Sequence, residues 1–169
     1  MLDTDLKDLA ARQEGLKAFM RLYPQGVTVV TTRVGDCAYG MTISSFTSVS
    51  MDPPLVLMAI DRSTNSYQAF KEAKIFAIHL LSSGQAVLSE IFAGRQKTRD
   101  KFEGINYEEG PERVPLLRDT PAYLVCRRFK IYEAGDHDLI LCEVLDVVIK
   151  RPELKPLVYR NRAYTTVDS

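Results

Sequence analysis

The feature that most constrains this fold is a succession of short apolar and β-branched runs, separated by only a few turn residues. Residues 27–33 form the first run, Gly35 and Asp36 make a turn, and residues 39–44 return directly. Further strands are predicted at 46–50, 55–60, 75–81, 122–132, 139–149, 157–159 and 163–167. Strands joined by such short turns pair antiparallel. The pattern therefore favours a mainly β fold, an antiparallel barrel with flanking helices, over an alternating parallel α/β sheet.

Three helices are predicted around these strands. Apolar residues recur at helical spacing over residues 1–22, and we expect this amphipathic helix to pack on the body or on a second subunit. A second helix is predicted at 63–74, and Ser82 with Gln85 forms a capping-box pattern that opens a third. Residues 104–119 are predicted to form a loop.

Length and composition limit the class of protein. A chain of 169 residues fits a single domain, which we expect to consist of an N-terminal helix over 1–22 and a barrel over 23–166. Lys plus Arg and Asp plus Glu both number 22, so the formal net charge is zero, which argues against a nucleic-acid partner. No apolar run approaches the roughly 20 residues that span a bilayer, and the charged N-terminus is unlike a signal peptide. We expect a cytoplasmic protein that does not enter membranes.

The sequence lacks the residues that several kinds of catalytic or binding site require. The three cysteines form no C-x-x-C pair and the chain has only two histidines, so neither a disulfide framework nor a metal site is expected. Dinucleotide-binding glycine motifs, phosphate-binding loops and nucleophile elbows are all absent from the sequence. If the chain is an enzyme, an organic cofactor is expected to carry its reactive chemistry.

The segment 40–50 is unusually rich in hydroxyl side chains, which lie between apolar positions and directly precede Pro53 and Pro54. Hydroxyls and backbone N–H groups suit a polar ligand with many acceptors, such as a ribityl chain and a phosphate. Gly40 would allow the backbone to approach a flat ring closely. A solvated edge strand rich in Ser and Thr explains the same residues, and composition alone leaves both interpretations open.

The ordered motifs of the chain resemble those of the flavin reductase-like family, the reductase components of two-component flavin monooxygenases, with flavoredoxins as near relatives. The resemblance runs from about Phe19 to Tyr164. It is carried by Pro24-x-Gly26 with the strand 27–32, by Gly40-Met41-Thr42-x-Ser44-Ser45-Phe46-x-Ser48-Val49-Ser50-x-Asp52-Pro53-Pro54, by Phe76-Ala77-Ile78-x-Leu80-Leu81, by Phe92-Ala93, Lys101-Phe102 and Pro115-Leu116-Leu117, by Gly135-Asp136-His137, and by Pro156-Leu157-Val158-Tyr159.

The resemblance implies a split β-barrel homodimer that binds FMN or FAD near the subunit interface. It assigns flavin binding to the hydroxyl-rich strand, assisted by the strand of Thr28 and by Asp61 and Arg62 at a strand end. The basic stretch Arg95, Lys97, Arg99 and Lys101 offers Arg95 and Lys101 as phosphate ligands, and a solvated charged loop explains the same residues. The cofactor-binding residues that it implies are Thr28, Met41, Thr42, Ser44, Ser45, Thr47, Ser48, Asp61, Arg62, Phe92, Arg95 and Lys101.

The resemblance also assigns a place to the reducing co-substrate, NADH or NADPH. Gly135, Asp136 and His137 match the family's nicotinamide-binding turn, and Tyr164 matches an aromatic residue that closes this site. His137 is the residue closest to a catalytic role, because its imidazole would stack on or hydrogen-bond the nicotinamide. The implied reaction is hydride transfer to flavin, with reduced flavin supplied to a separate oxygenase. Without the family resemblance, the residues Gly135, Asp136 and His137 predict only an ordinary hairpin turn with a surface histidine.

Three alternatives to a reductase remain at this stage. A flavoredoxin-like electron-transfer protein would keep FMN bound and share the hydroxyl-rich segment, but would not need rapid nicotinamide turnover. A non-enzymatic flavin- or haem-binding barrel is the second, and a structural β-barrel subunit is the third. His79 departs from the family pattern, in which many members carry Asn. Either it replaces a polar contact or, as we favour, it is a hydrogen-bonded core histidine.

Overall fold

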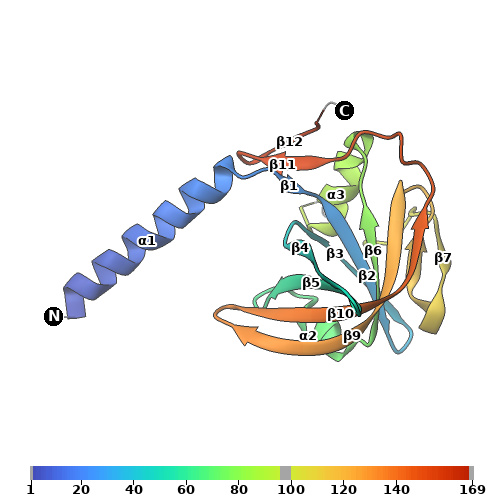
Figure 1. Cartoon of the computed structure of the whole chain (residues 1–169), viewed down its shortest axis with the longest axis horizontal. Helices are drawn as coiled ribbons and strands as arrows, with labels where there is room; N and C mark the ends of the chain where they lie inside the picture. Colours follow the sequence, from blue (N-terminus) through green and yellow to red (C-terminus); the bar gives the residue numbers. More distant parts are fainter. Residues whose placement is uncertain (1, 96–99, 168–169) are drawn as a thin grey trace.

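The computed structural model describes residues 2–95 and 100–167, with residues 2–7 described by their backbone alone. Its centre is a seven-stranded sheet in which all neighbouring strands pair antiparallel (Figure 1). In spatial order the strands are β3 (Cys37–Ile43), β2 (Thr28–Val34), β6 (Ile75–Leu80), β9 (Ala122–Ala134), β10 (His137–Ile149), β5 (Pro54–Asp61) and β4 (Phe46–Met51).

The two edges of this sheet are consecutive strands of the chain. β3 ends at Ile43 and β4 begins at Phe46, yet they lie at opposite ends of the strand order. Two residues span only about 7 Å, so the sheet has to curl until its edges approach each other. Ser45 fixes the join, since its hydroxyl donates to the Ala59 carbonyl at 2.7 Å and its carbonyl accepts the Ala59 N–H at 3.3 Å. The predicted mainly β, split-barrel architecture is confirmed, with a curled sheet that stays open.

Two small sheets lie outside the main one. The first contains β1 (Gln25–Gly26), β11 (Val158–Arg160) and β12 (Ala163–Thr165), and the second contains β7 (Tyr107–Glu109) and β8 (Pro115–Leu117). β7 and β8 fall within residues 104–119, so the prediction of a plain loop there was wrong. Val114, Leu116 and Leu117 are buried, which explains why this segment is ordered against the sheet.

The three helices are α1 (Leu2–Leu22), α2 (Tyr67–Glu72) and α3 (Ala86–Phe92), the last preceded by a 3₁₀ turn at Ser83–Gln85. A second 3₁₀ turn covers Pro111–Arg113. The Gln85 side chain accepts the Ser82 N–H at 2.9 Å, as the capping pattern predicts. α2 is shorter than the predicted 63–74, because residues 63–66 form turns before the helix begins.

α1 projects from the body and is tied to it only at its C-terminal turn (Figure 1). Its apolar residues Leu16, Phe19 and Leu22 are 63%, 66% and 66% exposed. Of the two predicted packing partners, the body of its own subunit is excluded and a second subunit remains, because the apolar face of α1 is uncovered in a single chain. None of the helices in the described ranges is both long and apolar enough to cross a membrane.

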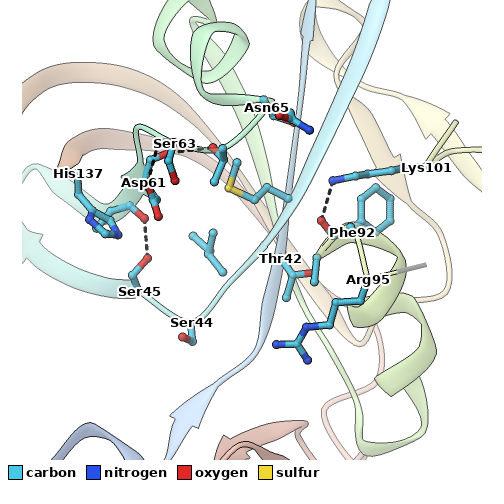
Figure 2. A pocket seen from close by; sticks show the side chains of 17 residues that line it. Thr42, Ser44, Ser45, Asp61, Ser63, Asn65, Phe92, Arg95, Lys101 and His137 are labelled. Carbon is cyan, nitrogen blue, oxygen red and sulfur yellow. Dashed lines mark hydrogen bonds between the residues drawn. The ribbon is translucent and has the colours of Figure 1, made fainter. Parts of the chain in front are cut away.

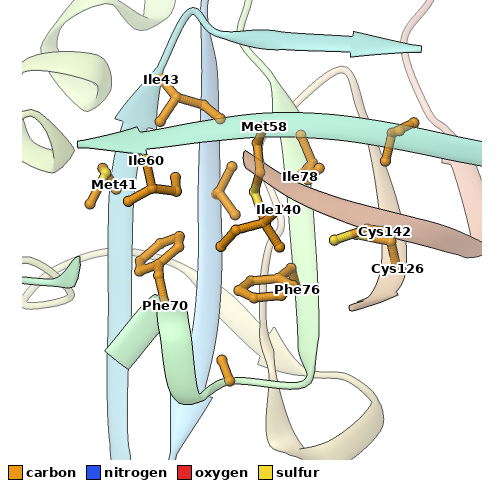
Figure 3. Close-up of a cluster of buried hydrophobic side chains, with 13 residues drawn as sticks. Met41, Ile43, Met58, Ile60, Phe70, Phe76, Ile78, Cys126, Ile140 and Cys142 are labelled. Carbon is orange, nitrogen blue, oxygen red and sulfur yellow. The ribbon is translucent and has the colours of Figure 1, made fainter. Parts of the chain in front are cut away.

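The main core fills the inside of the curled sheet (Figure 3). Phe70 of α2 and Phe76 of β6 lie 5.8 Å apart between ring centres, and both are fully buried. Around them pack side chains from the remaining strands, including Met41, Ile43, Met58, Ile60, Ile78, Cys126, Ile140 and Cys142. Burying this apolar surface from both edges of the sheet stabilises the curled form and fixes the position of the seam between β3 and β4.

His79 is a fully buried histidine whose two ring nitrogens both have partners. Nδ1 lies 3.0 Å from the Val29 carbonyl, and Nε2 accepts the Leu117 N–H at 3.0 Å. This pairing requires a neutral ring protonated on Nδ1. Burial, the largest cause, lowers the pKa of His79 to about 4. His79 is thus a hydrogen-bonded core residue that joins β2, β6 and β8.

We predict that His79 makes stability depend on acid pH. Its pKa is lower in the folded protein than in the unfolded chain, so its contribution is complete above pH 6.5 and is lost as pH falls toward 4. The loss over this window is about 3 kcal/mol in the free energy of unfolding. Urea titrations between pH 7 and pH 4 measure it, with His79→Gln as the comparison. Equal slopes in both proteins, or an NMR titration of His79 near 6.5, would contradict the assignment.

Candidate functional site

A cavity of about 660 Å³ opens at the seam between β3 and β4 (Figure 2). Three segments line it: residues 41–45 at the seam, residues 63–66 after β5, and residues 92–95 at the end of α3. The single residues Ala59, Asp61, Lys101 and His137 complete the lining. In Figure 2, His137 lies at one end of the cavity, and Lys101 and Arg95 lie at the other. Most of its polar groups are hydroxyls, with two cations at one end.

The hydroxyls at the seam already donate hydrogen bonds within the protein. Thr42 donates to the Ser89 carbonyl at 2.7 Å, Ser44 to the Gln25 side chain at 3.3 Å and Ser45 to the Ala59 carbonyl at 2.7 Å. Each oxygen keeps lone pairs that accept from a ligand. β3 is also an edge strand, so the backbone groups on its outer side have no neighbouring strand. The seam thus offers a ligand backbone N–H and C=O groups and hydroxyl acceptors.

Gly40 lets the β3 backbone lie close to an aromatic ring, and that ring is the Phe92 side chain of the protein itself. A Cβ built at Gly40 would lie 2.3 Å from a ring carbon of Phe92, which no side chain tolerates. Phe92 is fully buried and packs edge-on against Phe102 at 5.2 Å between ring centres. Gly40 therefore brings the end of α3 against β3, which places residues 92–95 in the cavity wall.

Two basic side chains mark one end of the cavity. Lys101 donates to the Phe92 carbonyl at 2.9 Å and to the Gly40 carbonyl at 3.3 Å, and burial lowers its pKa. Arg95 binds Glu90 at 2.9 Å, and its pKa is raised, first by a hydrogen bond with Tyr159 and then by Glu90. Both suit a phosphate, since each retains donors after these contacts. Lys97 and Arg99 of the same basic stretch lie outside the described residues.

The sequence analysis missed the segment 63–66, in which Ser63, Thr64, Asn65 and Ser66 all line the cavity. The Asp61 carboxylate accepts the Ser63 N–H at 2.7 Å, and hydrogen bonding by Ser63 is the main cause that lowers the pKa of Asp61. Four consecutive polar residues directly after a strand were a detectable signal. They were assigned to the start of a helix instead, and the structure places them before it.

His137 reaches the cavity from a two-residue hairpin loop. Gly135 has a φ of +63°, which glycine adopts readily at the first position of such a loop. β10 then pairs with β5 so that His137 lies opposite Asp61. Its Nδ1 is 2.6 Å from the Asp136 carboxylate, which leaves Nε2 for a ligand. Gly135 and Asp136 themselves support His137 and do not line the cavity.

Four residues of the predicted flavin set lie outside the main cavity. Thr28 is buried, and its hydroxyl donates to the Ile43 carbonyl at 3.0 Å, so it holds β2 to β3. Arg62 pairs with the buried Asp138 at 2.6 Å. Thr47 and Ser48 are exposed on β4, beyond the seam. A strand exposes alternate faces, so a motif that continues through a strand does not place every residue in one site.

Tyr164, predicted to close the nucleotide site, lines a smaller neighbouring cavity of about 140 Å³. Its hydroxyl lies 2.8 Å from the Ser89 hydroxyl. This second cavity shares Thr42, Ser44 and Arg95 with the main one, so Tyr164 stands beside the seam on its other side. The remaining predicted residues, Met41, Thr42, Ser44, Ser45, Asp61, Phe92, Arg95, Lys101 and His137, all line the main cavity.

The sequence of this chain matches a known protein family. The family model described as "Flavin reductase like domain" matches residues 20–168, which includes every wall of the cavity. The chain belongs to the flavin reductase-like family. The match covers most of the chain, and the sequence resemblance to this family is confirmed.

Relatives within the flavin reductase-like family agree over most of their length. The chain is 38% identical over 152 residues to the reductase component of 4-hydroxyphenylacetate 3-monooxygenase of Thermus thermophilus, covering 90% of this chain and 95% of that protein. It is 44% identical over 123 residues to the FMN reductase (NADH) SmoA of Agrobacterium fabrum, covering 73% and 69%. The solved structure of the flavin reductase HpaC complexed with NADP+ superposes with a TM-score of 0.84 at 35% identity, covering 92% and 97%.

Proposed function

We propose that this protein is an NAD(P)H-dependent flavin reductase that transfers hydride from NADH or NADPH to FMN or FAD. The observation that carries the proposal is one cavity with hydroxyl and backbone groups at the seam, Arg95 and Lys101 at one end, and His137 at the other. Family membership supports it, since relatives are an FMN reductase (NADH), a monooxygenase reductase component and a flavin reductase complexed with NADP+.

The residues of the main cavity fit a flavin. Edge-strand backbone groups and the hydroxyl oxygens of Thr42, Ser44 and Ser45 would hold the polar edge of the ring and the ribityl chain. Lys101 and Arg95 would hold the phosphate. When bound, flavin would supply the acceptor for the hydride of the reduced nicotinamide, and the walls of the cavity would hold the two rings together. Backbone N–H donors at the seam would stabilise the negative charge that develops on reduction.

His137 would orient the nicotinamide. The Asp136 carboxylate at 2.6 Å holds the Nδ1 side of the imidazole, so the ring has a fixed edge toward the cavity. No side chain has to act as a nucleophile or as an obligatory acid or base, because hydride transfer needs only alignment of the two rings. His137 is therefore a binding and positioning group whose loss affects the nucleotide more than the flavin.

We further propose a cytoplasmic homodimer that passes reduced flavin to a separate oxygenase. Val147 and Ile149 of β10 and Leu80 of β6 are 56%, 66% and 47% exposed, and they line an apolar groove of about 460 Å³. Such a surface, together with the uncovered face of α1, is typical of a protein interface.

Sedimentation equilibrium of the wild-type protein should give twice the mass of the chain, and the substitution Ile149→Lys should shift the measured mass toward that of the monomer. A wild-type monomer at micromolar concentration would contradict the dimer.

The reductase proposal is tested by following NADH and NADPH oxidation with FMN, FAD or riboflavin present, and without flavin. We expect flavin-dependent oxidation of at least one nucleotide and formation of reduced flavin under anaerobic conditions. No oxidation with any pair would overturn the proposal. Stable flavin binding without nucleotide turnover would instead favour the electron-transfer alternative.

The variant His137→Ala, measured in the same assay, tests whether His137 binds the nucleotide. We expect its KM for the nucleotide to rise about tenfold, as the loss of one charge-assisted or stacking contact predicts, with little change in flavin Kd. Arg118→Ala, which removes an exposed pair with Glu108 far from the cavity, is the control and should match wild type. A large loss of flavin affinity with normal nucleotide kinetics in His137→Ala would contradict this role.

A further inference from the structure

A third, basic cavity of about 260 Å³ lies between the C-terminal turn of α1 and the turn that joins β11 to β12. Four of its lining residues are cationic: Lys17, Arg21, Arg160 and Arg162. They come from two segments that are 140 residues apart in the sequence and meet at this point in the fold (Figure 1). The chain as a whole has no net charge, so this cavity is a local excess of positive charge.

The cations of this basic cavity have few internal partners. Lys17 binds Glu14 at 2.7 Å, and Glu14 also interacts electrostatically with Arg21 and Arg162. Within the described ranges, the side chains of Arg21 and Arg162 make no hydrogen bond or ion pair. One carboxylate, already bound by Lys17, is thus the partner recorded for both Arg21 and Arg162. Like charges held together repel, and an anion between them would remove that repulsion.

The backbone holds these cations in place. The Asn161 N–H donates to the Arg21 carbonyl at 2.9 Å, and Arg160 Nε donates to the Leu22 carbonyl at 3.2 Å. These two bonds fix the β11–β12 turn to the end of α1. Asn161 and Arg162 have φ values of +50° and +61°, so the turn is a defined tight turn. The backbone that carries Arg21 and Arg162 and the side chain of Arg160 are therefore held at this cavity before any ligand arrives, which lowers the entropy lost on binding.

The basic cavity lies next to the proposed flavin site, with the cavity beside Tyr164 between them. That intermediate cavity shares Thr42, Ser44 and Arg95 with the main cavity and Tyr159 with the basic cavity. Tyr159 also hydrogen-bonds Arg95. Arg95 and Tyr159 thus lie between the seam and the arginines of the turn, and a dinucleotide that extends past them reaches both.

We infer that Arg21, Arg160 and Arg162 form an anion subsite for the adenosine-side phosphate of a dinucleotide whose reactive ring occupies the seam. The inference rests on the proposed function. The phosphate belongs either to the adenosine half of FAD or to the 2′-phosphate of NADPH, since FMN lacks an adenosine half and NADH lacks that third phosphate. The subsite therefore determines which member of each pair the enzyme prefers.

The test compares wild type with R160Q/R162Q, in which both changes are exposed and keep the side chain polar. Calorimetry gives Kd for FAD and FMN and for two isolated probes, ADP for the FAD source and 2′,5′-ADP for the NADPH source, and kinetics give KM for NADPH and NADH. We expect one probe to bind about tenfold more weakly. If that probe is ADP, the preference for FAD over FMN should also fall about tenfold, and if it is 2′,5′-ADP, the preference for NADPH over NADH should fall about tenfold. Whichever preference falls identifies the source of the phosphate. Arg118→Gln is the matched control and should change neither preference.

The outcomes separate this inference from the reductase proposal. Unchanged affinity for both probes and unchanged preferences in R160Q/R162Q would overturn the subsite, even if the enzyme reduces flavin normally. Weaker binding of ADP or of 2′,5′-ADP supports the subsite whether or not turnover is seen, because that measurement needs no reaction. A variant that weakens FMN and FAD equally, or NADH and NADPH equally, would also contradict a phosphate-specific subsite.

Discussion

The structure depends on the requirement that two consecutive strands, β3 and β4, form opposite edges of one sheet. Only Ser44 and Ser45 separate them, so the sheet has to curl and the core inside it has to be filled from both edges. The same requirement leaves β3 as an edge with unpaired backbone groups beside a polar cavity. The seam is thus both the closure point of the fold and the place where we propose that the flavin binds.

The polar groups around the seam are largely satisfied before a ligand binds. Thr42, Ser44 and Ser45 donate to protein acceptors, Lys101 holds the end of α3 against β3, and Asp61 orders the segment after β5. These contacts prearrange the site, so binding orders few side chains. In the proposed function, a flavin at this site would be recognised mainly by backbone groups and hydroxyl lone pairs, because the hydroxyl protons are already donated within the protein.

Strand order along the chain and the mainly β class could be predicted from the sequence, because strand runs and turn residues are local signals. Nine of the residues that line the cavity were also predicted: seven lie in motifs that the family shares, Asp61 lies at a strand end, and Arg95 lies in a basic stretch. Thr28, Thr47, Ser48 and Arg62 could not be excluded in advance, because which face a residue presents depends on the register of pairing. Residues 63–66 were missed because their polar run also suits a helix start. The free face of α1 depends on partners that no single-chain pattern reveals.

Amide hydrogen exchange of the full chain with and without saturating FMN tests most directly whether the seam holds the flavin. If FMN binds in the main cavity at the seam, the backbone amides of residues 41–45, 61–66 and 92–95 should exchange more slowly when FMN is present, because these segments lie around the cavity. Residues in the apolar groove at 121–124 and 147–149 should show no slowing that depends on FMN alone. Protection confined to that groove, with exchange at the seam unchanged, would contradict the account.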